Sequence, residues 1–297
     1  MRHVKILLAL LVFCFSVSAQ TIIKRTLVEG QGTPLVMLPG GTVDISALSL
    51  VSRGMENLHR VIRMENLNVQ YAGKGQTLPK DYSVQMEAES VKATLDSLKV
   101  TGPIILMGHS YGGLIALEYA LKNPENIIAL ILLEPPVFGI AEARFESPAG
   151  MKNMIAITKE LTPDAVITED MVARFRCELL DCETTSVFDL PQWPIWLNQK
   201  DRLRGLSAVC DYKLDLRKVH RFRPPVLILT GTESVPFHKR INALLTAEFT
   251  NSMAESIESD HAIPSKAPSE LVKCLKNFLK RELETPEDRI RRVSTIN

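Results

Sequence analysis

The stretch Gly108-His109-Ser110-Tyr111-Gly112 places a serine between two glycines, in the pattern Gly-x-Ser-x-Gly. A serine hydroxyl is a poor nucleophile at neutral pH, and it becomes an effective one when a histidine takes its proton and a carboxylate orients that histidine. The three fixed positions are a weak signal by themselves, because short patterns of common residues occur by chance. The neighbouring residues therefore decide whether Ser110 is a nucleophile or an ordinary loop serine.

The residues on either side of this pattern have the character of a strand and of a helix. Residues 103–107 form a short apolar run that Gly108 ends, and residues 114–121 have apolar side chains at helical spacing. A sharp turn between a strand and a helix is the setting of a nucleophile elbow, in which small glycines let the two elements approach closely. The context therefore favours Ser110 as a nucleophile presented at the carboxyl end of a strand.

Strands and helices alternate along much of the chain. Short apolar runs at residues 35–38, 127–133 and 225–229 predict buried strands, and residues 83–98 predict a helix with Ser83 as its N-cap. Residues 268–283 carry apolar side chains on one helical face, which suits a helix packed on a sheet. This alternation predicts an α/β protein whose parallel sheet is covered by helices on both faces.

The chain contains GHSYGG around Ser110, LPGG upstream of it and DHAIP downstream of it. Together these stretches resemble the α/β-hydrolase superfamily. The resemblance implies a mostly parallel central sheet flanked by helices, with a core formed by residues 20–136 and 224–284. The alternation stops in residues 137–223, which are expected to form an inserted helical cap, and residues 285–297 are expected to form a polar tail. The resemblance also implies catalytic residues in the order serine, acid, histidine.

Several histidines compete for the role of catalytic base. His261 precedes the final helix, where the resemblance places the family's histidine, and we assign it this role. His238 follows a predicted strand and stays open as an alternative. His109 neighbours the serine on a tight turn, where packing or a hydrogen bond to substrate is the expected role. His59 and His220 are expected to be polar surface residues.

The acid of the triad has two main candidates. In the commonest pattern of the family the acid follows the strand at residues 225–229, but the corresponding position here is Ser234, which cannot serve. Glu233 is adjacent to it and is the alternative acid. Some members of the superfamily carry the acid one strand earlier, and Glu134 ends that strand in LILLEPP. An acidic residue that closes an apolar strand is costly without a partner, so we predict Glu134 and leave Asp260 as a lesser possibility.

The charge that develops on a carbonyl oxygen during acyl transfer needs hydrogen-bond donors. The backbone N–H of Tyr111, directly after the serine, is one candidate. The other is the N–H of Gly41, in a Pro39-Gly40-Gly41 turn that resembles the family's oxyanion loop, with proline in place of the usual histidine. A simple structural turn is the alternative interpretation of this segment.

The predicted cap holds aromatic residues and two neighbouring cysteines. Phe188, Trp193 and Trp196, with several methionines, either line an apolar pocket or form the cap's own core. Cys177 and Cys182 are close enough in CELLDC to close a small disulfide loop, and reduced buried thiols are the alternative.

The N-terminus has the pattern of a secretory signal peptide. Arg2 and Lys5 precede an apolar run at residues 6–15, and small residues follow at 17–19. We therefore expect residues 1–19 to be removed and the protein to be exported, either to the periplasm or to the medium. The apolar run is too short to span a membrane comfortably, for which about 20 residues are needed, and no stable membrane span is expected in the mature chain.

Charge and composition exclude several classes of partner. The chain has 35 basic and 34 acidic residues among 297, with no block of like charge, so nucleic acid is not an expected partner. We expect no cofactor. We also expect no metal, because no CxxC or HxxxH pairing occurs. The sequence predicts an exported serine hydrolase that cleaves an ester or a related acyl bond of a small molecule through an acyl-enzyme. The alternative is a catalytically inactive ligand-binding protein with the same fold, favoured by the serine at position 234.

Overall fold

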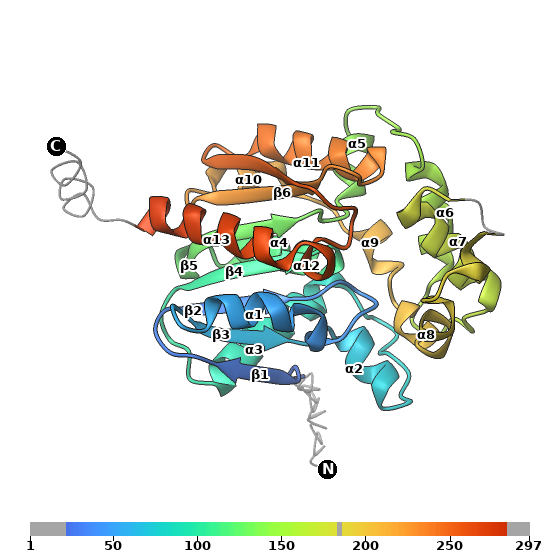
Figure 1. Ribbon diagram of the computed structural model, residues 1–297, viewed down its shortest axis with the longest axis horizontal. Helices are drawn as coiled ribbons and strands as arrows, with labels where there is room; N and C mark the ends of the chain where they lie inside the picture. Colours follow the sequence, from blue (N-terminus) through green and yellow to red (C-terminus); the bar gives the residue numbers. More distant parts are fainter. Residues whose placement is uncertain (1–21, 183–185, 284–297) are drawn as a thin grey trace, which may run out of the picture.

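The computed structural model of the protein describes residues 22–182 and 186–283 (Figure 1). The expectations for residues 1–19 and 285–297 lie outside these described residues. The described chain forms one sheet of seven strands. These strands are β1 (Thr26–Glu29), β2 (Pro34–Leu38), β3 (Arg60–Met64), β4 (Ile104–His109), β5 (Ile127–Leu133), β6 (Val226–Gly231) and β7 (Ser252–Ile257).

The strand order in the sheet is β1-β3-β2-β4-β5-β6-β7. Only β1 runs antiparallel to its neighbour, so the mostly parallel sheet that the sequence predicts is confirmed. The central strands β4 and β5 are buried almost throughout and mostly apolar because helices cover both faces. All six parallel strands end at the same edge, which is where side chains that follow them can meet.

Two helical layers cover the sheet. One layer consists of α1 (Ser49–Met55), α12 (Ile263–Lys266) and α13 (Pro268–Leu283), which pack against the sheet through one apolar cluster (Figure 1). The other layer includes α3 (Val84–Ser97), α4 (Tyr111–Lys122) and α11 (Pro236–Glu248), which belong to a second cluster on the opposite face. The short α2 (Leu67–Gly73) follows β3.

The elements that the sequence predicts are present in the sheet and its helices, but the strands β1 and β3 were not predicted. The Ser83 hydroxyl caps α3 by accepting a hydrogen bond from the Met86 N–H at 3.2 Å. The sequence has a short strand-like run at residues 255–258, and the strand β7 itself spans Ser252–Ile257. This strand lies at the edge of the sheet and is only partly buried, so it lacks the continuous apolar run that marks the inner strands.

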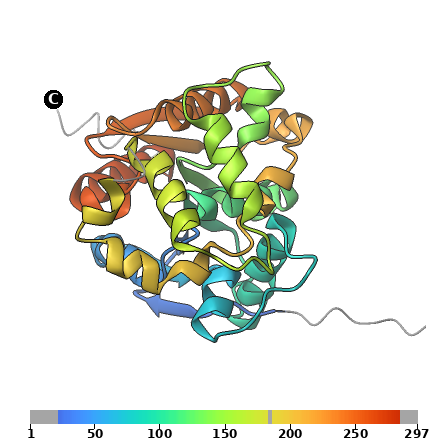
Figure 2. The same cartoon turned by 90° about the vertical axis from the view of Figure 1, so that its right-hand side faces the viewer.

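Between β5 and β6 the chain leaves the sheet and forms a set of short helices. These are α5 (Phe138–Glu142), α6 (Met151–Glu160), α7 (Glu169–Leu180), α8 (Trp193–Asn198), α9 (Ala208–Asp211) and α10 (Leu216–Arg221). Helices α6, α7 and α8 lie at one end of the sheet, and Figure 2 views the molecule from that side. We refer to residues 137–223 as the cap. No helix in the described ranges is both long and apolar enough to cross a membrane.

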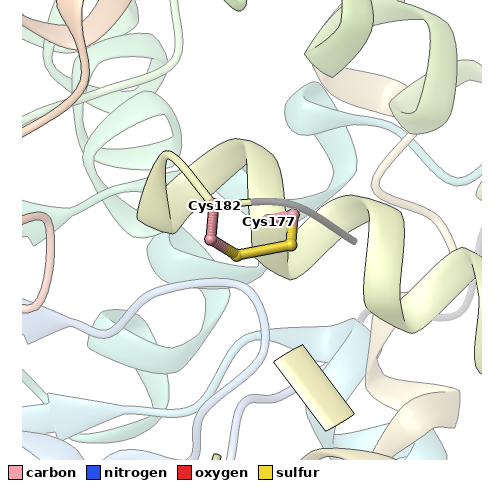
Figure 3. Close-up of a disulfide and its surroundings, with 2 residues drawn as sticks. All are labelled: Cys177 and Cys182. Atoms are coloured by element: carbon pink, nitrogen blue, oxygen red, sulfur yellow. A yellow bond between two sulfur atoms is a disulfide. The ribbon is translucent and has the colours of Figure 1, made fainter. Parts of the chain in front are cut away.

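Cysteines tie the end of α7 to the residues that follow it. Cys177 and Cys182 form a disulfide, which closes the small loop that their spacing allows (Figure 3). Cys210 and Cys274 are free thiols. The disulfide fixes the carboxyl end of α7, a helix that contributes to the pocket described below.

Candidate active site

Ser110 stands at a strained turn between β4 and α4. Its backbone has φ +53° and ψ −124°, a region that non-glycine residues rarely occupy. The flanking glycines make the turn possible: a Cβ on Gly108 would lie 2.2 Å from the Gly112 carbonyl oxygen, and one on Gly112 would lie 2.3 Å from that of Pro39. Strand, turn and helix therefore meet at distances that only glycine allows, and this geometry is that of a nucleophile elbow.

The structure brings Ser110, His261 and Glu134 into one chain of hydrogen bonds. His261 Nε2 lies 2.9 Å from Ser110 Oγ, and His261 Nδ1 lies 2.6 Å from Glu134 Oε2. These residues come from the ends of β4, the segment after β7 and the end of β5. With the Nδ1 proton donated to the carboxylate, Nε2 is free to accept the serine proton.

Glu134 is fully buried, with 0% of its surface exposed. Its Oε1 accepts a hydrogen bond from the Gly231 N–H at 2.8 Å, which ties the end of β5 to the end of β6. Burial alone would raise the pKa of Glu134, but the hydrogen bond to His261 and smaller contributions from neighbouring side chains together outweigh it and lower the pKa to about 2. The carboxylate is therefore ionised throughout the range in which enzymes usually work.

The alternative acids lie elsewhere. Glu233 is exposed, and its backbone N–H donates to the Ser259 carbonyl. The two ring nitrogens of His261 have Glu134 and Ser110 as their partners instead. Asp260 points away from its neighbour, because its carboxylate accepts hydrogen bonds from the Ala262 N–H and from Lys266.

Two further histidines surround the ring of His261. His238 stacks on it with ring centroids 4.2 Å apart and planes inclined by 14°. His109 donates from Nε2 to the His261 carbonyl oxygen at 2.7 Å, so it supports the backbone of the histidine loop. Burial, with His261 nearby, lowers the pKa of His109 to about 3 and that of His238 well below its usual range. Both rings are therefore neutral at physiological pH.

The LPGG segment is held against the elbow by two buried asparagines. Asn66 Nδ2 donates to the Pro39 carbonyl at 2.9 Å, and Asn68 Nδ2 donates to the Gly41 carbonyl at 2.6 Å. A Cβ on Gly41 would lie 3.0 Å from the Cβ of Tyr111, so the two candidate oxyanion donors are neighbours. Among the described residues, neither backbone N–H donates to a protein acceptor. Tyr111 also begins α4, whose partial positive N-terminal charge favours an anion there.

A cavity opens in front of Ser110 between the sheet edge and the cap. Its empty space is about 950 Å³, including the part that is open to solvent. Ser110, His261, Gly41 and Tyr111 line it from the core. Most of the lining from the cap is apolar, as it is in pockets for small organic ligands.

The residues that line this cavity do not include Phe188, Trp193 or Trp196. Trp193 and Trp196 pack against the small apolar cluster of Ala173, Cys177 and Val187, so they belong to the cap's own core. Met154 and Phe175 line the cavity instead, together with Arg176, which no sequence pattern singles out. Arg176 and Arg174 are two residues apart on α7, and only the tertiary packing of the helix decides which of them meets the cavity.

The cluster of Glu134, His238 and His261 also has the composition of a metal site. Each offers one ligand atom, and these atoms lie within 4.8 Å of one another. Both nitrogens of His261 and one oxygen of Glu134 already take part in the hydrogen-bond chain. A metal ion would therefore have to displace that chain, and the donor set fits proton transfer better than ligation.

The fold and the site define a family. Residues 33–284 match the family model for the alpha/beta hydrolase fold. The chain therefore belongs to the α/β-hydrolase family, as the motifs around Ser110 indicate.

Several relatives show which proteins this chain resembles. It is 24% identical to a provisionally named esterase/lipase from Haemophilus influenzae, over 94% of this chain and 92% of the relative. It is 31% identical to a cis-3-alkyl-4-alkyloxetan-2-one decarboxylase from Shewanella oneidensis, but this match covers only 39% of the chain and 36% of that protein. Among solved structures, a thermophilic esterase from Thermogutta terrifontis superposes with a TM-score of 0.66 at 18% identity, over 87% of this chain and 93% of that one.

Proposed function

We propose that this protein is an exported serine hydrolase that cleaves a carboxylic ester through an acyl-enzyme. The observation that carries the proposal is the hydrogen-bond chain from Ser110 Oγ through His261 to Glu134, with distances of 2.9 Å and 2.6 Å. Names of relatives support the same class, since both the full-length relative from Haemophilus influenzae and the neighbour from Thermogutta terrifontis are named as esterases.

In the proposed reaction Ser110 Oγ forms a bond to the ester carbonyl carbon while its proton passes to His261 Nε2. The negative carbonyl oxygen of the tetrahedral intermediate is stabilised by the backbone N–H groups of Gly41 and Tyr111, and the loss of one such donor costs about 3 kcal/mol. The carbon–oxygen bond to the alcohol then breaks, and the leaving alkoxide takes the proton from His261. An acyl group remains on Ser110.

Water completes the cycle by the same steps. It attacks the acyl carbonyl while His261 takes one of its protons, and Ser110 regains that proton as the carboxylic acid is released. Glu134 stabilises the protonated imidazole in both halves of the reaction without itself becoming protonated, because its pKa of about 2 keeps it ionised. No cofactor or metal enters these steps.

Export remains part of the proposal because of the N-terminal sequence. A disulfide between Cys177 and Cys182 agrees with an oxidising compartment. Expression of the full chain followed by fractionation and N-terminal sequencing tests this part: a mature protein that begins at Gln20 supports it, and an uncleaved protein in the cytoplasm contradicts it.

A fluorophosphonate probe tests the nucleophile directly. We expect the wild type to be labelled and to hydrolyse p-nitrophenyl esters, and the Ser110→Ala variant to do neither. The matched control is Ser256→Ala, a serine on β7 outside the cavity lining, which should be labelled like the wild type. A folded wild type that is neither labelled nor active would instead support the ligand-binding alternative.

A further inference from the structure

Arg176 brings a positive charge to the wall of the cavity. It lies on α7 between Phe175 and Cys177, and it lines the same cavity as Ser110. No Asp, Glu or Lys is among the described residues that line this cavity. Arg176 is thus the one side chain in the lining that carries a permanent charge.

The guanidinium has no anionic partner in the described part of the chain. Its Nε is buried without a hydrogen-bond acceptor, and this residue forms no ion pair with any residue of 22–182 or 186–283. Burial lowers the pKa of Arg176 to about 10, and the group is still charged at neutral pH. Its charge lies over the ring of Trp196, 4.8 Å from the centroid, and such a contact with an aromatic face offsets only part of the desolvation.

The neighbouring arginine on the same helix gives a direct contrast. Arg174 forms two hydrogen bonds of 2.8 Å to Glu160 and one of 2.7 Å to Asp170, so its charge is fully paired outside the cavity. Two arginines of one helix therefore have different environments. A buried hydrogen-bond donor without a partner calls for an explanation. The planar guanidinium group of an arginine can donate two parallel hydrogen bonds to the two oxygens of a carboxylate.

We propose that Arg176 binds a carboxylate of the substrate, so that this enzyme acts on esters whose acyl or alcohol part carries a carboxylate. This inference rests on the proposed ester hydrolysis and adds to it the chemical class of the substrate. The aromatic contact holds the guanidinium in place before the substrate arrives, and the apolar lining accommodates the chain between the ester and the carboxylate.

Matched ester pairs test this selectivity. In the first pair, monomethyl adipate carries a carboxylate on the acyl side and is compared with its neutral carbamoyl isostere. In the second pair, O-acetylglycolate carries a carboxylate on the alcohol side and is compared with the neutral O-acetylglycolamide. A charge-assisted hydrogen bond corresponds to about a tenfold to hundredfold preference in kcat/KM for the anionic member. We expect this preference in at least one pair, and it should fall at least tenfold in Arg176→Gln. The control Arg174→Gln, on the same helix, should keep it.

A binding measurement separates this proposal from the proposed reaction. Calorimetric titration with adipate should give a Kd at least tenfold lower than with the neutral adipamide, and Arg176→Gln should remove that difference. If adipate binds through Arg176 but no ester is hydrolysed, the carboxylate site is supported and the hydrolase proposal fails. Equal binding of adipate and adipamide by the wild type, or unchanged selectivity in a folded Arg176→Gln variant, overturns the carboxylate site.

Discussion

Replacement of Glu134 by glutamine tests the most specific feature of the site, the acid that follows β5. The substitution keeps the size of the side chain but removes the charge that His261 Nδ1 contacts at 2.6 Å. The pKa of this carboxyl falls from 4.5 to about 2 in the folded protein. At about 1.4 kcal/mol per pKa unit, this shift means that the folded protein favours the ionised carboxylate of Glu134 over the protonated one by roughly 3 kcal/mol.

The same interaction stabilises the imidazolium that forms in the transition state, so its loss raises the barrier by a comparable amount. We therefore expect kcat for a p-nitrophenyl ester to fall about a hundredfold to a thousandfold in Glu134→Gln. Fluorophosphonate labelling should slow in parallel, because both reactions need the same proton transfer. The assay is steady-state release of p-nitrophenol, with the unfolding midpoint recorded to show that the variant is folded.

Glu233→Gln is the matched control, since this residue is the other carboxylate that the sequence offers. Its side chain is exposed, and we expect kcat within twofold of the wild type. A folded Glu134→Gln variant with kcat within tenfold of the wild type would refute the assignment of the acid. A Glu233→Gln variant as slow as Glu134→Gln would do so as well.

Three further outcomes follow from the structure. Gly112→Ala should lower the free energy of unfolding in urea by about 3 kcal/mol, because the new Cβ would lie 2.3 Å from a carbonyl oxygen. Gly102→Ala is the control and should change this free energy little, because no atom lies within 4 Å of the new Cβ. Since folding lowers the pKa of Glu134, the ionised carboxylate stabilises the fold above pH 4.5, and this stabilisation is lost as the pH falls towards 2. The difference in unfolding free energy between wild type and Glu134→Gln should therefore shrink over this pH range. A difference that stays constant would contradict the linkage between the pKa and stability. Removal of the Cys177–Cys182 disulfide by a double serine substitution should cost about 2 kcal/mol for so short a loop, and an unchanged urea midpoint would argue against the bond.

The sequence was most informative where a single backbone geometry demands particular residues. The elbow needs glycine at positions 108 and 112 because carbonyl oxygens lie where a Cβ would stand, and this requirement is visible as a motif. The buried strands were also predictable, since burial on both faces requires continuous apolar runs. The family that these features indicate is the one to which the chain belongs.

Features that depend on how distant segments pack were not predictable in the same way. The sequence favours Glu134 over Glu233 only because an acid without a partner is costly at the end of an apolar strand. The arrangement of the strand ends is what brings Glu134 to His261. The helical periodicity of α7 places Arg174 and Arg176 on different faces of the helix, but it does not show which face lines the cavity. The asparagines that hold the LPGG turn lie on a segment about 27 residues away, and no local pattern connects them to it.

In the proposed triad the acid follows β5, so the loop after β6 takes no part in proton transfer. Ser234 is buried, and its hydroxyl helps to lower the pKa of Glu134. An aspartate at this position would bring a second negative charge close to the carboxylate of Glu134. Two such charges about 4 Å apart repel each other by roughly 4 kcal/mol at an effective dielectric constant of 20. The serine at position 234 therefore keeps the surroundings of Glu134 free of a competing negative charge.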